Sequence, residues 1–262
     1  MSPLSPTDRF AAMVADEPHR LDLGAALIAA HGDPEVDVDG LLVRLDSLAS
    51  EVSEPSLDGL LDWYRTSGFR GDMETYGDPV NSFLHLVLDR RLGIPISLAV
   101  VLIEVGRRVG VPLAGVSMPG HFLVRHTGVN GLLLDPFDGA RRLDEVAAQG
   151  LHARVLGDEQ GFHPAYLAPV APLDVITRML TNLRLAYARS QDLAELVWVL
   201  RLRTMLPRVD PSERRALASV LATQGRFVDA AAELTTLADA TDDPADADRL
   251  RIEARTLLAK LN

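Results

Sequence analysis

The segment from Ile96 to Val109 constrains the fold most, because it is long enough for a helix and is apolar almost all round. A helix of this kind has no face to offer to water and has to be enclosed by other elements. Three short runs typical of β-strands follow it, separated by turn residues: Leu113–Ser117, His121–His126 and Leu132–Asp135. A buried helix followed by antiparallel strands predicts an α+β core over residues 75–145 and argues against a Rossmann sheet.

The residues before this core have the periodicity of short helices. Apolar side chains repeat at helical spacing in three places: 23–30, 41–48 and 57–64. Ser56 is a candidate cap for the last of these helices. The glycines and proline of residues 68–79 predict a loop, after which Asn81 is expected to cap a helix that runs to about residue 91.

From Pro172 onward the chain again has helical patterns, and the candidate helices are 172–189, 191–206, 211–224, 226–239 and 243–261. The apolar residues on both sides of Gly225-Arg226-Phe227 are similar to a tetratricopeptide repeat, in which small residues let paired helices pack closely. Two degenerate repeats are few for a solenoid, so a plain helical bundle stays open as an alternative. We expect one domain at residues 1–165 and a tetratricopeptide-repeat-like helical region at residues 166–262.

Composition excludes several classes of function. The 262 residues contain no cysteine, which excludes disulfides, thiolate metal sites and thiol catalysis. The net charge of −11 argues against a general nucleic-acid binder, because phosphate contacts need a basic surface. Lys260 is the only lysine, and arginine pairs are scattered at Arg90-Arg91, Arg107-Arg108, Arg141-Arg142 and Arg214-Arg215. No apolar segment approaches the ~20 residues of a membrane helix and no secretory signal is visible, so we expect a cytoplasmic protein without membrane contact.

A segment from Gly93 to Pro112 resembles the core motif of the transglutaminase-like family, which has the form G-x-C-x-x-x-A followed by R-x-x-G-[IV]-P. In this chain it reads Gly93-Ile94-Pro95-Ile96-Ser97-Leu98-Ala99, then Arg107 and Gly110-Val111-Pro112. Farther along, His121 resembles the family's catalytic histidine at the start of a strand. Asp135, in the segment Leu134 to Gly139, resembles the aspartate that orients that histidine. The resemblance covers about residues 75–145 and implies a papain-like α+β fold.

The same resemblance shows what is missing, because Pro95 occupies the position of the family's nucleophilic cysteine. In the family, that cysteine opens the buried helix, where the helix dipole and free N–H groups stabilise a thiolate. The histidine takes the proton and the aspartate fixes its tautomer. Proline suits a first helical turn but carries no nucleophile. The resemblance therefore implies a degenerate site of Pro95, Ser97, His121 and Asp135, with no catalytic residue assigned.

Two further segments, Asn81 to Leu98 and Pro119 to Arg125, are similar to the SirB-type proteins. These bacterial proteins join a cysteine-less transglutaminase-like domain to tetratricopeptide repeats. With the helical C-terminal part, this resemblance covers most of the chain. It implies the fold more than the function.

Each polar residue near the motif has a second, structural interpretation. Ser97 could be a surrogate nucleophile, or its hydroxyl could form a hydrogen bond near the helix start. His121 could be a site residue or a structural partner of Asp135. Glu104, on the buried helix, needs a partner, for which an arginine is the simplest choice. No recognisable ligand spacing joins the histidines that could be imagined as metal ligands beside Asp135: His85, His121 and His126.

Three functions follow from these alternatives. The first is a non-catalytic pseudo-enzyme that acts as a protein-interaction or regulatory module and binds a protein or peptide. The second is a hydrolase or acyltransferase that uses Ser97, His121 and Asp135, in which His121 has to reach the Ser97 hydroxyl. The third is a scaffold that touches nucleic acid through arginine pairs merged into one basic face. We expect no cofactor and no metal, and the sequence sets no oligomeric state.

Overall fold

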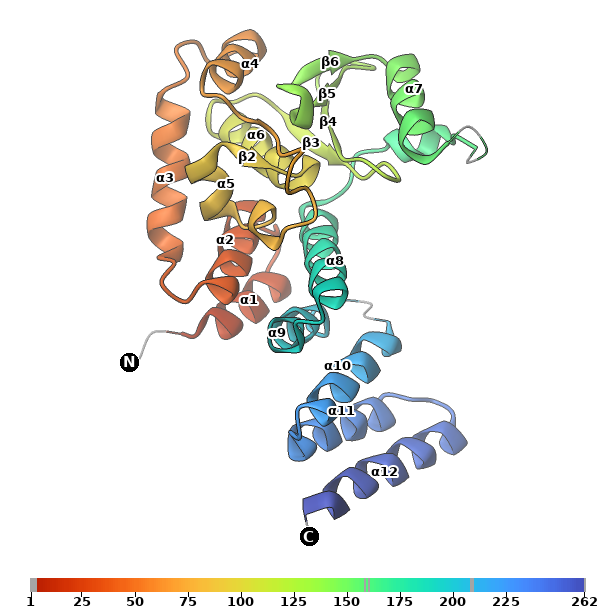
Figure 1. Ribbon diagram of the computed structural model, residues 1–262. Helices are drawn as coiled ribbons and strands as arrows, with labels where there is room; N and C mark the ends of the chain where they lie inside the picture. Colours follow the sequence, from red (N-terminus) through yellow and green to blue (C-terminus); the bar gives the residue numbers. More distant parts are fainter. Residues whose placement is uncertain (1–3, 158, 160, 208–209, 262) are drawn as a thin grey trace. The chain divides into compact units, whose positions relative to one another are not determined.

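The computed structural model describes residues 4–157, 159, 161–207 and 210–261. The chain divides into two units, Met1–Met179 and Leu180–Asn262. The first unit contains helices and a sheet, and the second is helical (Figure 1). Among the described residues, no helix combines the length and the apolar character needed to cross a membrane.

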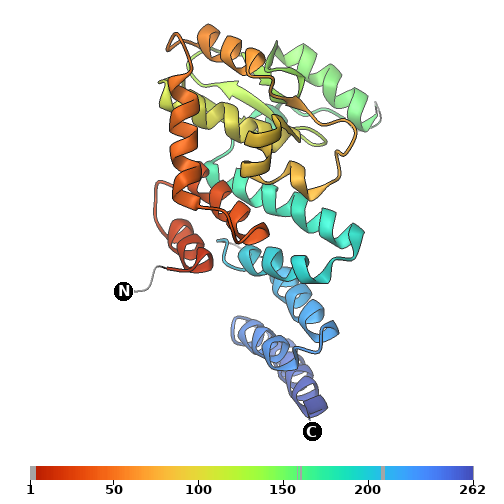
Figure 2. The same cartoon turned by 60° about the vertical axis from the view of Figure 1, so that its left-hand side comes forward.

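The first unit is built around α6 (Pro95–Arg108), in which every residue from Pro95 to Gly106 is buried. The helices that contact α6 are α2 (Leu21–Gly32), α3 (Val38–Ser50), α4 (Leu57–Thr66) and α5 (Leu84–Arg90). Figures 1 and 2 show α6 enclosed between helices and strands. The predicted buried helix is confirmed, and enclosure removes its apolar side chains from water on every side.

A four-stranded antiparallel sheet follows α6, in the order β3-β4-β5-β6. Its strands are β3 (Leu113–Val116), β4 (Leu123–His126), β5 (Leu133–Asp135) and β6 (Arg141–Leu143). The three predicted strands are confirmed, although β4 begins at Leu123, so His121 lies two residues before the strand and not at its start as predicted. The fourth strand, β6, lies outside the prediction. The register places Val124 opposite Leu134 and Asp135 opposite Arg141. A short parallel pair, β1 (Arg70–Gly71) with β2 (Leu92–Gly93), interrupts the predicted loop.

One cluster of buried side chains joins the sheet to α7 (Glu145–Leu156) and to the short turn η3 (Pro164–Leu167). Its members are Val116, Met118, Leu123, Leu133, Leu143, Ala148 and Leu167. On another side, α6 contacts β3 and β4. The strands are therefore covered by helices, and α7 lies outside the predicted helices although Asp144 caps it.

The helix starts agree with the sequence at one predicted cap and disagree at another. Ser56 caps α4 as predicted, accepting the N–H of Gly59 at 3.1 Å. Asn81 does not cap α5, which begins at Leu84 without a side-chain cap. Asn81 instead ends the short turn η1 (Pro79–Asn81) and is fully buried. A helix α1 (Pro6–Ala15) precedes the predicted ones.

The second unit consists of successive helices after the boundary inside α8 (Pro172–Ser190). They are α9 (Leu193–Arg203), α10 (Pro211–Thr223), α11 (Phe227–Asp239) and α12 (Pro244–Leu258), with a last turn η4 (Ala259–Leu261). Each helix from α9 to α12 contacts the next. The helices α10, α11 and α12 share a core rich in alanine. Gly225, at φ 74°, makes the left-handed turn between α10 and α11. The Lys260 ammonium lies 5.3 Å from the centre of the Phe227 ring.

Candidate functional site

His121 and Asp135 form a buried hydrogen-bonded pair. The Nε2 atom of His121 lies 2.9 Å from Oδ1 of Asp135, and the two residues are 9% and 3% exposed. An ionised carboxylate only accepts, so the ring donates from Nε2. The other ring nitrogen, Nδ1, has no hydrogen-bonding partner among the described residues. The predicted contact is confirmed, and it leaves Nδ1 available to another group.

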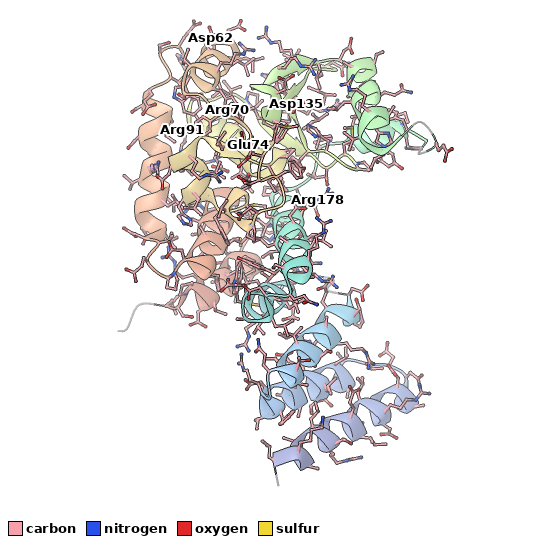
Figure 3. All side chains as sticks on the ribbon, in the orientation of Figure 1. Asp62, Arg70, Glu74, Arg91, Asp135 and Arg178 are labelled. Atoms are coloured by element: carbon pink, nitrogen blue, oxygen red, sulfur yellow. The ribbon has the colours of Figure 1, made fainter. Side chains whose placement is uncertain are left out.

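The turn after β5 fixes the carboxylate of Asp135, which is labelled in Figure 3. Asp135 caps the turn η2 (Pro136–Asp138), and its Oδ1 also accepts the N–H of Phe137 at 3.1 Å. From α4, the Tyr64 hydroxyl donates to the carbonyl of Pro136 at 3.0 Å. Burial, and then the nearby charge of Asp135, raise the pKa of Tyr64 well above its ordinary value, so this hydroxyl stays a donor.

The Phe137 ring connects the pair to the segment that leads into α6. It stands edge-on to the ring of His121, with 6.1 Å between the ring centres. A Cβ atom added at Gly71 of β1 would lie 2.3 Å from the Phe137 ring, so only glycine fits there. Because β1 pairs with β2, which directly precedes Ile94 and Pro95, the aromatic contact ties the His121 side to the start of α6.

Pro95 begins α6, as predicted, at the position that the motif gives to a nucleophile. It is buried, it follows the N-cap residue Ile94, and α6 contacts η2. Proline is preorganised for the first helical turn and lacks an N–H that would have no intrahelical partner there. The position therefore keeps the helix start and offers no group that can attack a substrate.

The Ser97 hydroxyl is hydrogen-bonded to backbone groups. Its hydroxyl donates to the carbonyl of Asn81 at 2.6 Å and accepts the N–H of Ile94 at 3.1 Å. The structural interpretation of Ser97, a hydrogen bond near the helix start, is confirmed. No hydrogen bond joins Ser97 to His121 within the described residues. The structure thus brings together two of the four candidate residues as a bonded pair and gives Ser97 a different set of partners.

A buried polar network, missed by the sequence analysis, holds the loop before α5. Asp72 accepts the Thr75 hydroxyl at 2.6 Å and the Arg90 guanidinium at 2.7 Å. Arg90 also donates to the Asn81 side chain at 2.9 Å, and Asn81 donates to the carbonyl of Thr75 at 2.6 Å. Hydrogen bonds from Thr75, and then Arg90, lower the pKa of Asp72 well below its usual range. Through the Asn81 carbonyl, this network reaches Ser97 and the start of α6.

His85 and His126, the other two histidines considered as metal ligands, have partners away from the His121–Asp135 pair. His85 Nε2 lies 3.5 Å from a carboxylate oxygen of Asp33, and His126 accepts the N–H of Gly128 through Nδ1 at 3.0 Å. In the part of the chain that the structure describes, no group of three or more His, Asp or Glu side chains is arranged to hold a metal ion.

Most arginines of the four sequence pairs form ion pairs with carboxylates. Arg107 and Arg108 both bind Asp22 and Glu104, which confirms an arginine partner for Glu104. The other acids are Asp72 for Arg90, Asp138 for Arg141, Asp58 for Arg142, Glu233 for Arg214 and Glu253 for Arg215. The Arg91 guanidinium lies over the Phe69 ring, with its central carbon 4.5 Å from the ring centre. Seven of these eight arginines therefore have a carboxylate partner that offsets their charge.

Comparison with known proteins gives a family match and several relatives. The family model of the Transglutaminase-like superfamily matches residues 37–181, which include both His121 and Asp135. A UPF0162 protein of Xylella fastidiosa is 42% identical over 196 residues, or 68% of this chain and 69% of that protein. A UPF0162 protein of Pseudomonas aeruginosa is 37% identical over 194 residues, or 70% of this chain and 71% of that protein.

A shorter similarity reaches a eukaryotic protein. F-box only protein 21 of Mus musculus is 45% identical over 71 residues, which are 27% of this chain and 11% of that protein. No solved structure matches the chain.

Proposed function

This chain belongs to the transglutaminase-like superfamily, and on that premise we propose that it is a non-catalytic member that acts as a protein-interaction or regulatory module. One observation carries the proposal. The His121–Asp135 pair is intact at 2.9 Å, whereas Pro95 stands at the nucleophile position. A histidine and an aspartate without a nucleophile cannot form the covalent intermediate on which this type of catalysis depends.

The proposal assigns the interaction role to the whole chain in the SirB-type arrangement. Residues 1–165 would be the transglutaminase-like domain with its N-terminal helices, and residues 166–262 a tetratricopeptide-repeat-like region. The sequential packing of α10, α11 and α12 supports this, because their shared core contains the small residues Ala218, Ala231 and Ala238. Small residues at such contacts are what closely packed helix pairs need. The partner is a protein or peptide, met in the cytoplasm.

The alternative, a hydrolase or acyltransferase using Ser97, His121 and Asp135, is weaker for a physical reason. A serine nucleophile needs a general base within hydrogen-bond reach. The Ser97 hydroxyl is buried and already bound to Asn81 and Ile94. Removing it from these contacts would leave the Ile94 N–H and the Asn81 carbonyl with the long hydrogen bond, 3.5 Å, that they make to each other.

The test combines turnover with partner capture on the full chain. With a panel of peptide, ester and amide substrates, we expect turnover no higher than that of the His121→Ala variant. Immobilised protein should retain a defined polypeptide from a lysate of the source organism. The double variant Val228→Glu and Ile252→Glu should lose it, because these apolar side chains of α11 and α12 are 60% and 55% exposed.

The matched control is Val146→Glu, which alters an equally apolar side chain of α7 that is 77% exposed. It should retain the polypeptide. Turnover by the wild type that disappears in Ser97→Ala would overturn the non-catalytic assignment. Equal retention by all three proteins would overturn the role of the helical region.

A further inference from the structure

A cleft of about 410 Å³ lies in the first unit, and neither His121 nor Asp135 lines it. Its walls include the apolar side chains of Leu21, Ile103 and Leu113, which come from α2, α6 and β3. A cleft of this volume falls within the range of about 300–1,000 Å³ that is usual for small-ligand pockets. Such pockets combine apolar walls with a few fixed polar groups.

The fixed polar groups here are arginines and buried carboxylates. Asp22 is 1% exposed, and its Oδ2 accepts from Nη2 of Arg20 at 3.1 Å, of Arg107 at 3.1 Å and of Arg108 at 2.9 Å. Glu104 is 3% exposed and accepts from Nε of Arg107 at 2.9 Å and Nη1 of Arg108 at 2.7 Å. Three guanidinium groups thus converge on two buried carboxylates, and Arg20, Arg107, Asp22 and Glu104 line the cleft.

Two of these arginines have donors to spare. The side chains of Arg20 and Arg107 are 54% and 56% exposed. Their Nη1 groups donate to nothing within the described residues. Because both Nη2 atoms lie 3.1 Å from the same oxygen of Asp22, they are no farther apart than twice that distance. The two guanidinium groups are therefore held side by side.

The cluster holds three arginines and three acids, so its formal charges balance. Asp46, the third acid, is 66% exposed and binds Arg108 at 2.6 Å. Arg108, by contrast, donates to all three acids and is 11% exposed. Arg20 and Arg107 are thus the groups of the cluster that combine wide exposure with unused N–H donors.

We propose that this cleft binds a small amphiphilic carboxylate, whose charged group pairs with Arg20 and Arg107 and whose apolar body rests against Leu21, Ile103 and Leu113. Guanidinium groups match the planar geometry of a carboxylate. The apolar walls favour a ligand with a hydrocarbon body over a bare inorganic anion. Two sources supply this chemistry, a free organic acid and the C-terminal residue of a peptide.

The test is isothermal titration calorimetry of the full chain with three probes: sodium octanoate, a peptide ending in leucine with a free carboxylate, and the C-terminal amide of that peptide. We expect saturable binding of one or both acids, and the acid that binds identifies the source. The amide should bind at least about tenfold more weakly, because it lacks the charge that a guanidinium pairs with. Failure of both acids to bind the wild type overturns the proposal, as does a peptide that binds and whose amide binds equally well.

The variants Arg20→Met and Arg107→Met keep the length of the side chain and remove its charge. Each should weaken binding about tenfold or more. The matched control Arg44→Met alters an arginine that pairs with exposed Asp89 at 2.6 Å and does not line the cleft, so its affinity should be unchanged. Wild-type affinity in both cleft variants overturns the proposal.

A measurement on the wild type covers the case in which a cleft variant does not fold. The methyl resonances of Leu21, Ile103 and Leu113 should shift on titration with the acid that binds, and those of Leu234 and Leu250 in the second unit should not. Shifts that spare the cleft methyls overturn the proposal.

Discussion

The substitution Pro95→Cys tests the degenerate site most directly, because it introduces one thiol into a chain that has no cysteine. The new side chain would stand at the first position of α6, a helix of 14 residues. A helix N-terminus stabilises a nearby negative charge by about 0.3–1 kcal/mol, and by about 2 kcal/mol when partly buried. Since one pKa unit corresponds to about 1.4 kcal/mol, the helix alone lowers the thiol pKa from about 8.5 to about 7–8.

Two other effects change the pKa of the same thiol. Burial of the position opposes ionisation and raises the pKa. If Pro95 and His121 belong to one site, as proposed, Nδ1 of His121 accepts the thiol proton, and the resulting imidazolium stabilises the thiolate and lowers the thiol pKa further. We therefore expect an apparent pKa below about 7.5 in Pro95→Cys, and a higher value when His121→Ala is added. Stability should fall by less than about 1 kcal/mol, because proline mainly restrains the unfolded chain.

The assay follows the ultraviolet absorbance of the thiolate against pH, which reports a buried thiol as well as an exposed one. The rate of iodoacetamide alkylation gives a second profile. Ser53→Cys, at an exposed loop position, is the matched control and should titrate near about 8.5. A Pro95→Cys thiol that titrates like this control, with or without His121, would refute the reasoning, since neither the helix end nor the histidine would then act on it.

Two further predictions concern the buried network that holds the start of α6. Ser97→Ala should lower the free energy of unfolding by about 1–3 kcal/mol, because Ile94 N–H and the Asn81 carbonyl lose a buried partner. Ser47→Ala, at an exposed hydroxyl, should change it by less than about 0.5 kcal/mol in the same urea titration, and equal effects would contradict the role of Ser97. The pKa of Asp72 is lower in the folded chain, so the unfolded chain binds the proton more tightly and stability falls as pH drops below the ordinary value of 3.8. Asp72→Asn should therefore be less stable than wild type near about pH 7 and should lose less on acidification to about pH 3, and parallel pH profiles would contradict this.

Sequence periodicity predicted the large elements because burial of apolar surface determines them. The enclosed helix at Pro95–Arg108 and the strands around Val124 and Leu134 follow directly from runs of apolar residues. The strands Arg70–Gly71 and Leu92–Gly93 could not be found in this way, since two residues are too few to show an alternation. Their pairing depends on where the rest of the chain brings them.

Asn81 shows why the local capping rule failed. An asparagine before an apolar run usually caps the helix that follows. Here its side chain instead binds Thr75, six residues before it in an irregular loop, and Arg90, nine residues after it at the end of α5. No periodic pattern marks such a network. Local sequence patterns could not predict the His121–Asp135 contact, because 14 residues and a whole strand separate the two. The family resemblance did predict it.

Lys260 has a consequence for how this protein can be modified and handled. It is the only lysine of the 262 residues, and its ammonium lies over the Phe227 ring. Acylation there would abolish a cation–π contact, whereas every arginine keeps its charge under the same chemistry. Enzymes that attach groups to lysine side chains therefore have one modification site on these 262 residues, in the last turn η4. A linker fixed to that amine would hold every molecule by the same end and leave the arginine-lined cleft of the first unit chemically untouched.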